Sequence, residues 1–367
     1  MAPVINITSK LLNIDDLKLL SRHTGPCVTI SIPRYQPGTG SGTRHAHLRN
    51  LTQTAAEQLG HLNRPEAPEA GDNVASALEL LAGKLDDGHG GPGVTLFCAP
   101  GFTAVYETPG VHTDGVTVGD YFDLLPLVAT AQSPNHFFVL GISKNKLRLF
   151  HYSNGRVEEL ALPIGVPDCL EAAGAFDEPE HTMDSHSAAG PSVGGLRGVR
   201  FASSGDQDSN AVYLRHFFGL VDFGLQETLN GAPLFLAGVQ EELSLYRKIA
   251  KYPKIFESEC HGNAEHASHD QVANHAAAGA LREYRLTADR AFRALPEIRN
   301  KIAGDAGAVL KAATEGRVRQ IFAAENGSPK AALNAAVVEA LRTGAEVFTY
   351  PGKELPGFGT IAAVLRY

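Results

Sequence analysis

The chain has 367 residues, of which 43% are apolar and 20% charged, as is typical of globular proteins. That length predicts two or three domains, and no apolar run approaches the roughly 20 residues of a membrane helix. The formal net charge of −8 is unusual for a dedicated nucleic-acid-binding protein, which is more often basic.

The start of the chain and the cysteines bear on the compartment. The first ten residues show no basic flank followed by an apolar stretch, so we expect no signal peptide and no membrane partner. The cysteines lie far apart and form no paired spacing: Cys27, Cys98, Cys169 and Cys260. This spacing predicts reduced thiols in a cytoplasmic protein. We expect no cofactor, and the residues leave the oligomeric state open.

The first third of the chain predicts a small α/β domain over residues 1–130. Apolar periodicity gives two amphipathic helices, one with Leu48, Leu51, Ala55 and Leu59 on one face and one beginning at a cap formed by residues 71–73. The other predicted elements are a helix over 15–23, a buried strand over 27–32, and a pair of strands over 94–99 and 103–107.

The middle third predicts three strands, an irregular segment, and an α-β-α run. Turn residues separate strands over 136–141, 146–151 and 156–162, which indicates an antiparallel meander. A segment over 173–207 reads as a long loop, and loops of that length are either functional or disordered. A helix around 213–229, a strand over 233–238 and a helix over 239–251 follow.

The last third predicts a histidine-rich connector, a long helix over 271–294 and a small alternating α/β domain. Its expected elements are a helix over 307–315, a strand over 318–323, a helix over 331–342, and strands over 346–349 and 360–365.

One stretch near the start is locally basic within this acidic chain. Between Lys18 and Arg49 there is no Asp or Glu. A glycine-rich loop that enters a helix presents free backbone amides to anions. We therefore expect phosphate contacts from Arg34, Arg44 and Arg49, with His45 and His47 in the same stretch; a solvated helix face is the alternative.

Three sequence patterns together resemble a known family. They are Gly25-Pro26 before the first core strand, the helix sequence of residues 213–222, and Glu315-Gly316-Arg317 with Gly344-Ala345-Glu346 before the last strands. The chain resembles the bacterial archaeo-eukaryotic release-factor-like families, which are related to release factors and Pelota. These patterns are core and turn residues, not catalytic signatures.

The resemblance implies three domains and a partner. The first domain is a variable α/β domain over 1–130, and the second is an RNase H-like domain over 131–258. The third, over 259–367, consists of a connector helix and a small α/β domain of the kink-turn-binding ribosomal-protein type. It also implies binding to the ribosome or tRNA, in peptidyl-tRNA hydrolysis or the rescue of stalled ribosomes.

Release factors place a Gly-Gly-Gln tip on a loop of their middle domain. The matching region here is a glycine-rich stretch whose candidate residues are Gly194, Gly195, Arg197 and Arg200. Leu196 stands where the family has Gln. A flexible loop with no catalytic role is therefore the alternative, and Pelota-type relatives, which lack the Gln, act in rescue without hydrolysis.

Other chemistries have weaker signals. An RNase H-like nuclease needs carboxylates on its core strands to hold metal ions, and the strands over 136–141 and 146–151 contain none. Neither Cys260, His261, His266 and His269 nor His181, Asp184 and His186 follow a usual zinc spacing. We expect no metal site.

The sequence thus predicts a ribosome- or tRNA-associated release-factor-like protein in termination or rescue, without a Gly-Gly-Gln tip for hydrolysis. The alternative is a non-catalytic protein-interaction module that binds no RNA, which the net charge favours. Whether any reaction is catalysed stays open. Salt-dependent RNA binding separates the two hypotheses.

Overall fold

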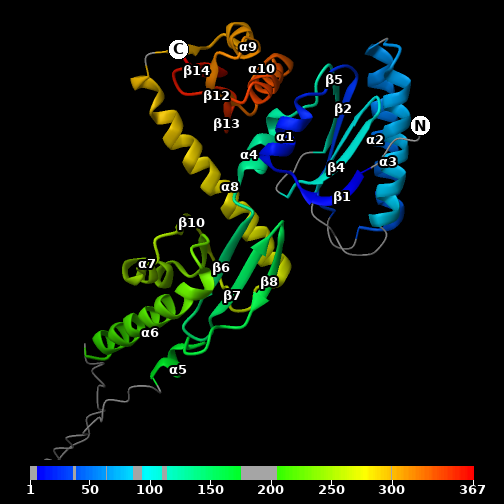
Figure 1. Ribbon diagram of the computed structural model, residues 1–367. Coiled ribbons are helices and arrows are strands. Elements are labelled where there is room, and N and C mark those ends of the chain that lie inside the picture. Colours follow the sequence, from blue (N-terminus) through cyan, green and yellow to red (C-terminus); the bar gives the residue numbers. More distant parts are fainter. Residues whose placement is uncertain are drawn as a thin grey trace, which may run out of the picture. The chain divides into compact units, whose positions relative to one another are not determined.

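The computed structural model describes residues 6–35, 39–62, 64–85, 93–109, 114–174, 205–298 and 300–367. Over these ranges the strands form three sheets (Figure 1). The chain divides into two compact units, one of residues 1–135 with 280–367 and one of residues 136–279. The mixed α/β class is confirmed. The three domain ranges and the names RNase H-like and kink-turn-binding remain predictions.

The first sheet has the strand order β1-β4-β3-β2-β5. β1 pairs parallel with β4, and the other neighbours are antiparallel. The strands are β1 (Asn6–Leu11), β2 (Cys27–Ile32), β3 (Val94–Ala99), β4 (Phe102–Glu107) and β5 (Gly115–Gly119). The edge strands β1 and β5 were not predicted, because four of the six residues of β1 are polar and the five residues of β5 include a glycine at each end.

Two helices cover one face of this sheet. α2 (Ser41–Leu62) buries the predicted stripe of Leu48, Leu51, Ala55 and Leu59, which is confirmed. The predicted cap of the next helix is wrong, because α3 (Ala67–Leu85) begins four residues earlier. Asn73 lies within α3, where its buried side-chain amide donates to the backbone oxygen of Ala99 at 2.9 Å. A cap-type residue therefore bonds to the end of β3 instead of to its own helix.

The second sheet has the order β10-β9-β6-β7-β8. The predicted meander is confirmed, and β9 and β10 add parallel strands beside β6. The strands are β6 (His136–Ile142), β7 (Arg148–Ser153), β8 (Arg156–Leu160), β9 (Leu234–Gly238) and β10 (Ile255–His261). β10 was not predicted, because Glu257, Ser258 and Glu259 make it polar.

The helices of this region are α5 (Leu170–Gly174), α6 (Gly205–Leu229), α7 (Gln240–Ile249) and α8 (His269–Arg293). α8 approaches the second sheet closely at Gly279. A Cβ atom there would lie 2.4 Å from Cε2 of Phe235, so only glycine lets the helix pack at this depth.

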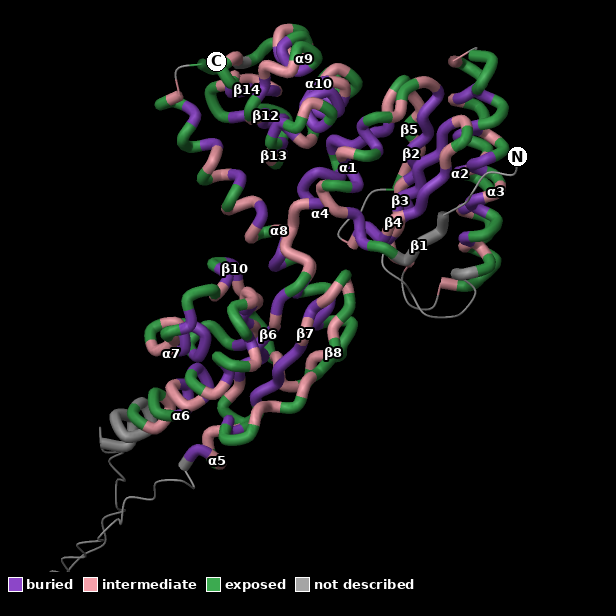
Figure 2. The backbone as a smooth tube through the Cα atoms, in the orientation of Figure 1, coloured by how far each residue is buried: buried purple, intermediate pink, exposed green. Residues whose placement is uncertain are grey.

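The third sheet has the order β11-β14-β12-β13. Its strands are β11 (Lys301–Ala303), β12 (Val318–Ala324), β13 (Glu346–Tyr350) and β14 (Ile361–Leu365), and its helices are α9 (Ala306–Thr314) and α10 (Lys330–Arg342). Only the three-residue β11 was not predicted. α10 is buried over most of its length (Figure 2). No helix in the described ranges is long and apolar enough to cross a membrane.

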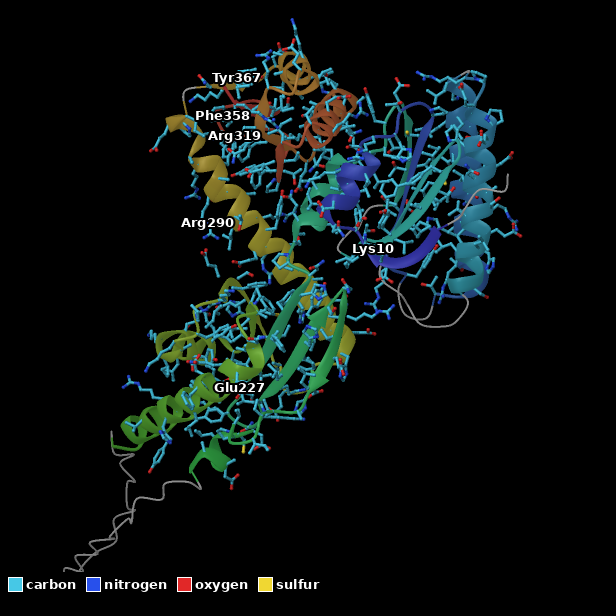
Figure 3. The ribbon with its side chains drawn as sticks, viewed as in Figure 1. Lys10, Glu227, Arg290, Arg319, Phe358 and Tyr367 are labelled. Carbon is cyan, nitrogen blue, oxygen red and sulfur yellow. The ribbon has the colours of Figure 1, made fainter. Side chains whose placement is uncertain are left out.

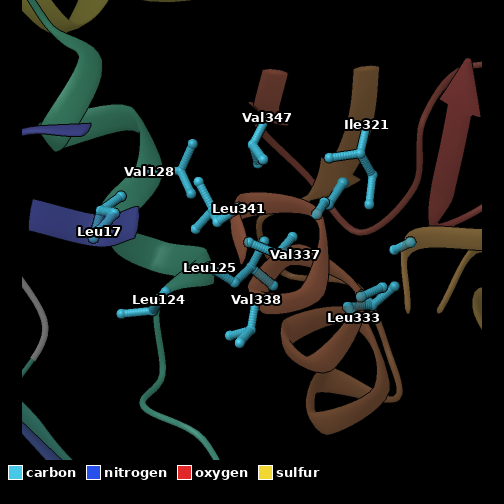
Figure 4. Close-up of a cluster of buried hydrophobic side chains, with 14 of the residues drawn as sticks. Leu17, Leu124, Leu125, Val128, Ile321, Leu333, Val337, Val338, Leu341 and Val347 are labelled. Carbon is cyan, nitrogen blue, oxygen red and sulfur yellow. The ribbon is translucent and has the colours of Figure 1, made fainter. Parts of the chain in front are cut away.

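The first and third sheets share one core within their unit. α1 (Ile14–Leu20), the turn η1 (Leu125–Leu127) and α4 (Val128–Gln132) contribute apolar side chains that pack with those of α10 and β13 (Figure 4). Asn334 of α10 adds a polar anchor. Its side-chain oxygen accepts from the backbone N–H of Leu124 at 2.9 Å and of Leu125 at 3.0 Å, and its amide donates to the oxygen of Phe122 at 2.9 Å.

Candidate functional site

The three arginines predicted to contact phosphate come from two segments of the chain. Arg34 follows the end of β2, whereas Arg44 and Arg49 lie on α2. Five residues correspond to about 140° around a helix, so Arg44 and Arg49 point in different directions. Arg49 is exposed and shares its face with His45, four residues earlier. Arg44 and Arg49 therefore do not share one face of α2, and the phosphate contacts of the three arginines stay a prediction.

Arg44 belongs to a cluster that joins three distant segments. The Tyr35 hydroxyl lies 2.9 Å from Nδ1 of His47, and Nε2 of His47 contacts the Asp114 carboxylate. The Arg44 guanidinium lies 5.7 Å from the centroid of the Tyr35 ring, within the range of a cation–π contact. We call Tyr35, Arg44, His47 and Asp114 the Tyr35 cluster.

The electrostatics of the Tyr35 cluster favour a neutral phenol. Burial raises the pKa of Tyr35, Arg44 lowers it, and Asp114 raises it. A protonated phenol is a hydrogen-bond donor, and the aromatic ring beside a guanidinium is a surface on which a nucleobase can stack. The carboxylate of Asp114 offsets the positive charge of Arg44, so the cluster does not attract a long polyanion by charge alone.

Tyr35 and Asp114 are residues that the sequence did not single out. Tyr35 adjoins the basic residue Arg34, which is a weak local signal. Asp114 begins the segment that leads into β5, 67 positions after His47. The pairing of β5 with β2 brings both residues to His47, and that pairing has no signature in the local pattern.

The predicted tip of the middle region lies outside the described residues. This covers Gly194, Gly195, Arg197 and Arg200, as well as the cluster of His181, Asp184 and His186. The described helices on either side of this segment are α5, which ends at Gly174, and α6, which begins at Gly205.

In the described part of the chain, no group of three or more His, Cys, Asp or Glu side chains is placed to hold a metal ion. Three histidines of the connector each approach a different carboxylate. His261 lies 3.5 Å from Glu259, His266 lies 3.8 Å from Glu265, and His269 lies 3.6 Å from Glu159. Cys260 lies at the end of β10.

The basic side chains of the last region are partly occupied. Arg317 pairs with Glu315. Lys301 donates to the backbone oxygen of Pro296 at 3.0 Å and lies 5.7 Å from the Phe358 ring centroid. Arg319 is exposed on β12 (Figure 3). Arg317 and Lys301 therefore already have partners within the chain.

Comparison with known proteins gives one family match. Residues 136–317 match the model of the Bacterial archaeo-eukaryotic release factor family 3. The matched range begins at the first residue of β6 and ends just before β12. It therefore includes the whole of the second sheet together with α6, α7 and α8. No curated protein matches the chain.

Several solved structures are similar over almost the whole chain, at low identity. The archaeal translation termination factor aRF1 is 14% identical over 97% of this chain and 99% of that chain, with a TM-score of 0.25. Archaeoglobus fulgidus Pelota is 12% identical over 100% of this chain and 99% of that chain, with a TM-score of 0.39. S. cerevisiae Dom34, a translation termination-like factor, is 10% identical over 98% of this chain and 94% of that chain, with a TM-score of 0.32. Because these scores are below 0.5, a functional proposal has to rest on the family match.

Proposed function

The chain belongs to the release-factor and Pelota-related family through residues 136–317, and from this membership we propose that it binds the ribosome or tRNA and acts in translation termination or ribosome rescue. The family match carries this proposal. The Tyr35 cluster supports it from a different part of the chain, because an aromatic ring and a guanidinium together suit RNA.

We propose a rescue role without ester hydrolysis. The hydrolytic tip of release factors is a Gly-Gly-Gln sequence whose backbone coordinates a water near the ester, and here Leu196 stands in place of the Gln after Gly194 and Gly195. The leucine side chain has no donor or acceptor to replace that of glutamine. The factor would then act by occupying the ribosome and not by cleaving the peptidyl-tRNA ester.

Co-sedimentation with bacterial ribosomes, empty and stalled on a truncated message, tests this proposal. We expect binding to stalled ribosomes to weaken as salt rises, because phosphate contacts release counterions. Arg44→Ala should weaken binding, whereas Lys248→Ala, which removes an equal charge at an exposed position of α7, should not. The same samples, assayed for peptide release, should retain their peptidyl-tRNA.

Absence of sedimentation with either ribosome state at low salt would refute the translational role. It would instead favour a protein-interaction module that binds no RNA, which is our second candidate function. The net charge of −8 supports that candidate, because like charge disfavours contact with a polyanion.

A further inference from the structure

A small cavity lies against the second sheet, at the end where its parallel strands stop. β6, β9 and β10 run parallel and all end on this side, and the segment 262–268 and the first turns of α8 cover it. Its volume is about 60 Å³, and it is lined by Val139, Gly141, Phe150, Phe235, Ala237, Gly238, Cys260, Gly262, Asn263, Ala264, Ala267, Val272 and His275. The carboxyl ends of parallel strands are a common place for ligands in α/β sheets.

Two glycines in the cavity wall allow the chain to approach itself closely. A Cβ atom on Gly238 would lie 2.6 Å from the backbone oxygen of Ile142, and one on Gly141 would lie 3.2 Å from Cβ of Ala264. The first distance is too short for any side chain. The second shows that the covering segment rests directly on β6. The space that remains is therefore set by backbone positions.

A buried arginine holds the covering segment in place. Nη1 of Arg148 donates to the backbone oxygen of Ala267 at 2.7 Å and of Glu265 at 3.3 Å. Its Nε and Nη2 donate to the two carboxylate oxygens of Glu159 at 2.8 and 2.7 Å. This bidentate pair satisfies the guanidinium charge. The segment that covers the cavity is thus held in place by an arginine that is not part of the cavity lining. The Ser143 hydroxyl also donates a hydrogen bond of 3.2 Å to the Glu265 carboxylate.

The chemistry of the lining excludes most classes of ligand. None of the lining residues is Asp, Glu, Lys or Arg, so no side chain is present to neutralise a phosphate or carboxylate, and Mg²⁺ or Ca²⁺ would lack carboxylate ligands. The polar side chains are Cys260, Asn263 and His275. A water molecule needs about 10–15 Å³ measured in this way, so the cavity accommodates several heavy atoms.

We propose that this cavity binds a small, uncharged and largely apolar molecule, with the Cys260 thiol in its wall. Such a ligand would make van der Waals contact with Phe150, Phe235 and Val272, and one polar atom could hydrogen-bond to Asn263 or His275. Pockets of this composition, mostly apolar with a few polar groups, are the usual form of small-molecule sites. This inference does not depend on ribosome binding.

Selective alkylation of Cys260 tests the proposal. N-phenylmaleimide is apolar, and iodoacetate is charged. The thiol adds to the maleimide double bond, forming an S–C bond while its proton passes to the neighbouring carbon. Cys169, which is part-buried elsewhere, serves as the internal reference. Cys27 and Cys98 should not react, because burial raises the pKa of each thiol to about 12.

We expect the ratio of the Cys260 rate to the Cys169 rate, read by peptide mass spectrometry, to be about tenfold higher for N-phenylmaleimide than for iodoacetate. Phenol, a small apolar molecule with one hydroxyl, should protect Cys260 and leave Cys169 unaffected. Ala237→Leu, which fills the cavity, should abolish both effects. Ala278→Leu on the exposed face of α8 is the matched control and should preserve them.

Equal rate ratios for the two reagents, or no protection of Cys260 by phenol, would overturn the proposal. Ala267→Leu fills the cavity from the covering segment instead of from β9, so it replaces Ala237→Leu if that variant does not fold. Ribosome sedimentation should be the same with and without saturating phenol. A failure of ribosome binding and a failure of cavity binding are therefore distinguishable.

Discussion

The two compact units carry sites of opposite character. The Tyr35 cluster in the first unit is part-exposed, contains a guanidinium and a carboxylate, and joins segments near residues 35, 44 and 114. The cavity in the second unit is lined without charged side chains and is covered by a fixed segment. The first should respond to salt and the second should not. This difference separates a surface for RNA from a site for a neutral small molecule.

Each unit also depends on one buried polar side chain that holds backbone groups. In the first unit Asn334 binds the backbone of residues 122–125. In the second unit Arg148 binds the segment that covers the cavity. These anchors differ in charge, and this difference makes their variants informative.

The largest effect should come from Arg148→Ala. The change leaves Glu159 and several backbone carbonyls without their donor, and we expect the free energy of unfolding to fall by about 3 kcal/mol. Urea denaturation of the wild type and the variant measures this difference in the free energy of unfolding. Arg148→Lys keeps the charge but cannot form the bidentate pair, so it should lose a substantial part of the same stability. Wild-type stability in the lysine variant would show that charge alone matters here.

A smaller loss is expected for Asn334→Ala. Two backbone N–H groups and one carbonyl would lose their partner where α10 meets residues 122–125, which corresponds to about 2 kcal/mol. Thermal denaturation followed by circular dichroism measures it. Asn334→Asp keeps the acceptor and should recover part of the loss. Unchanged stability in both variants would mean that the shared apolar core needs no polar anchor.

Acid should weaken the second unit through Glu159. The hydrogen bond from Arg148 holds the pKa of Glu159 below its usual value of 4.5. A carboxyl whose folded pKa is depressed stabilises the fold above its unfolded pKa, and this contribution disappears as the pH falls through the folded pKa. Stability measured between pH 6 and about pH 3 should therefore fall less steeply in Glu159→Gln. Equal slopes would show that the pair is not linked to acid stability.

The smallest effect should come from Tyr35→Phe. The variant keeps the ring beside Arg44 but removes the hydroxyl near His47, so binding to stalled ribosomes should weaken by only about threefold. Tyr35→Ala should weaken it further, because the stacking surface is removed as well. An equal loss in both variants would mean that the hydroxyl, and not the ring, is the group that touches RNA.

The sequence predicted elements whose patterns are local. The stripe of α2 and the β6–β8 meander follow from apolar periodicity and turn residues, and both are confirmed. The short or polar strands β1, β5, β10 and β11 were missed, because pairing with a neighbour stabilises them more than their own composition does. The predicted cap at Asn73 failed because its side chain bonds to another element.

The sites were harder to predict than the fold. Arg44 was chosen for its charge, yet Tyr35 and Asp114 of the same cluster come from segments that only the sheet brings together. The cavity has no sequence signal, because Gly141 and Gly238 look like ordinary strand residues until the backbone distances are known. Interactions between residues far apart in the chain therefore account for most of what the sequence left out.

The salt dependence of binding to stalled ribosomes tests the central claim most directly. We predict that the logarithm of the affinity of the wild-type chain falls linearly with the logarithm of salt concentration. Arg44→Ala should make this slope shallower by about one unit for each phosphate that the variant no longer neutralises. Binding that is absent at low salt, or equal for wild type and Arg44→Ala at every salt concentration, would contradict the proposed role of the Tyr35 cluster in RNA recognition.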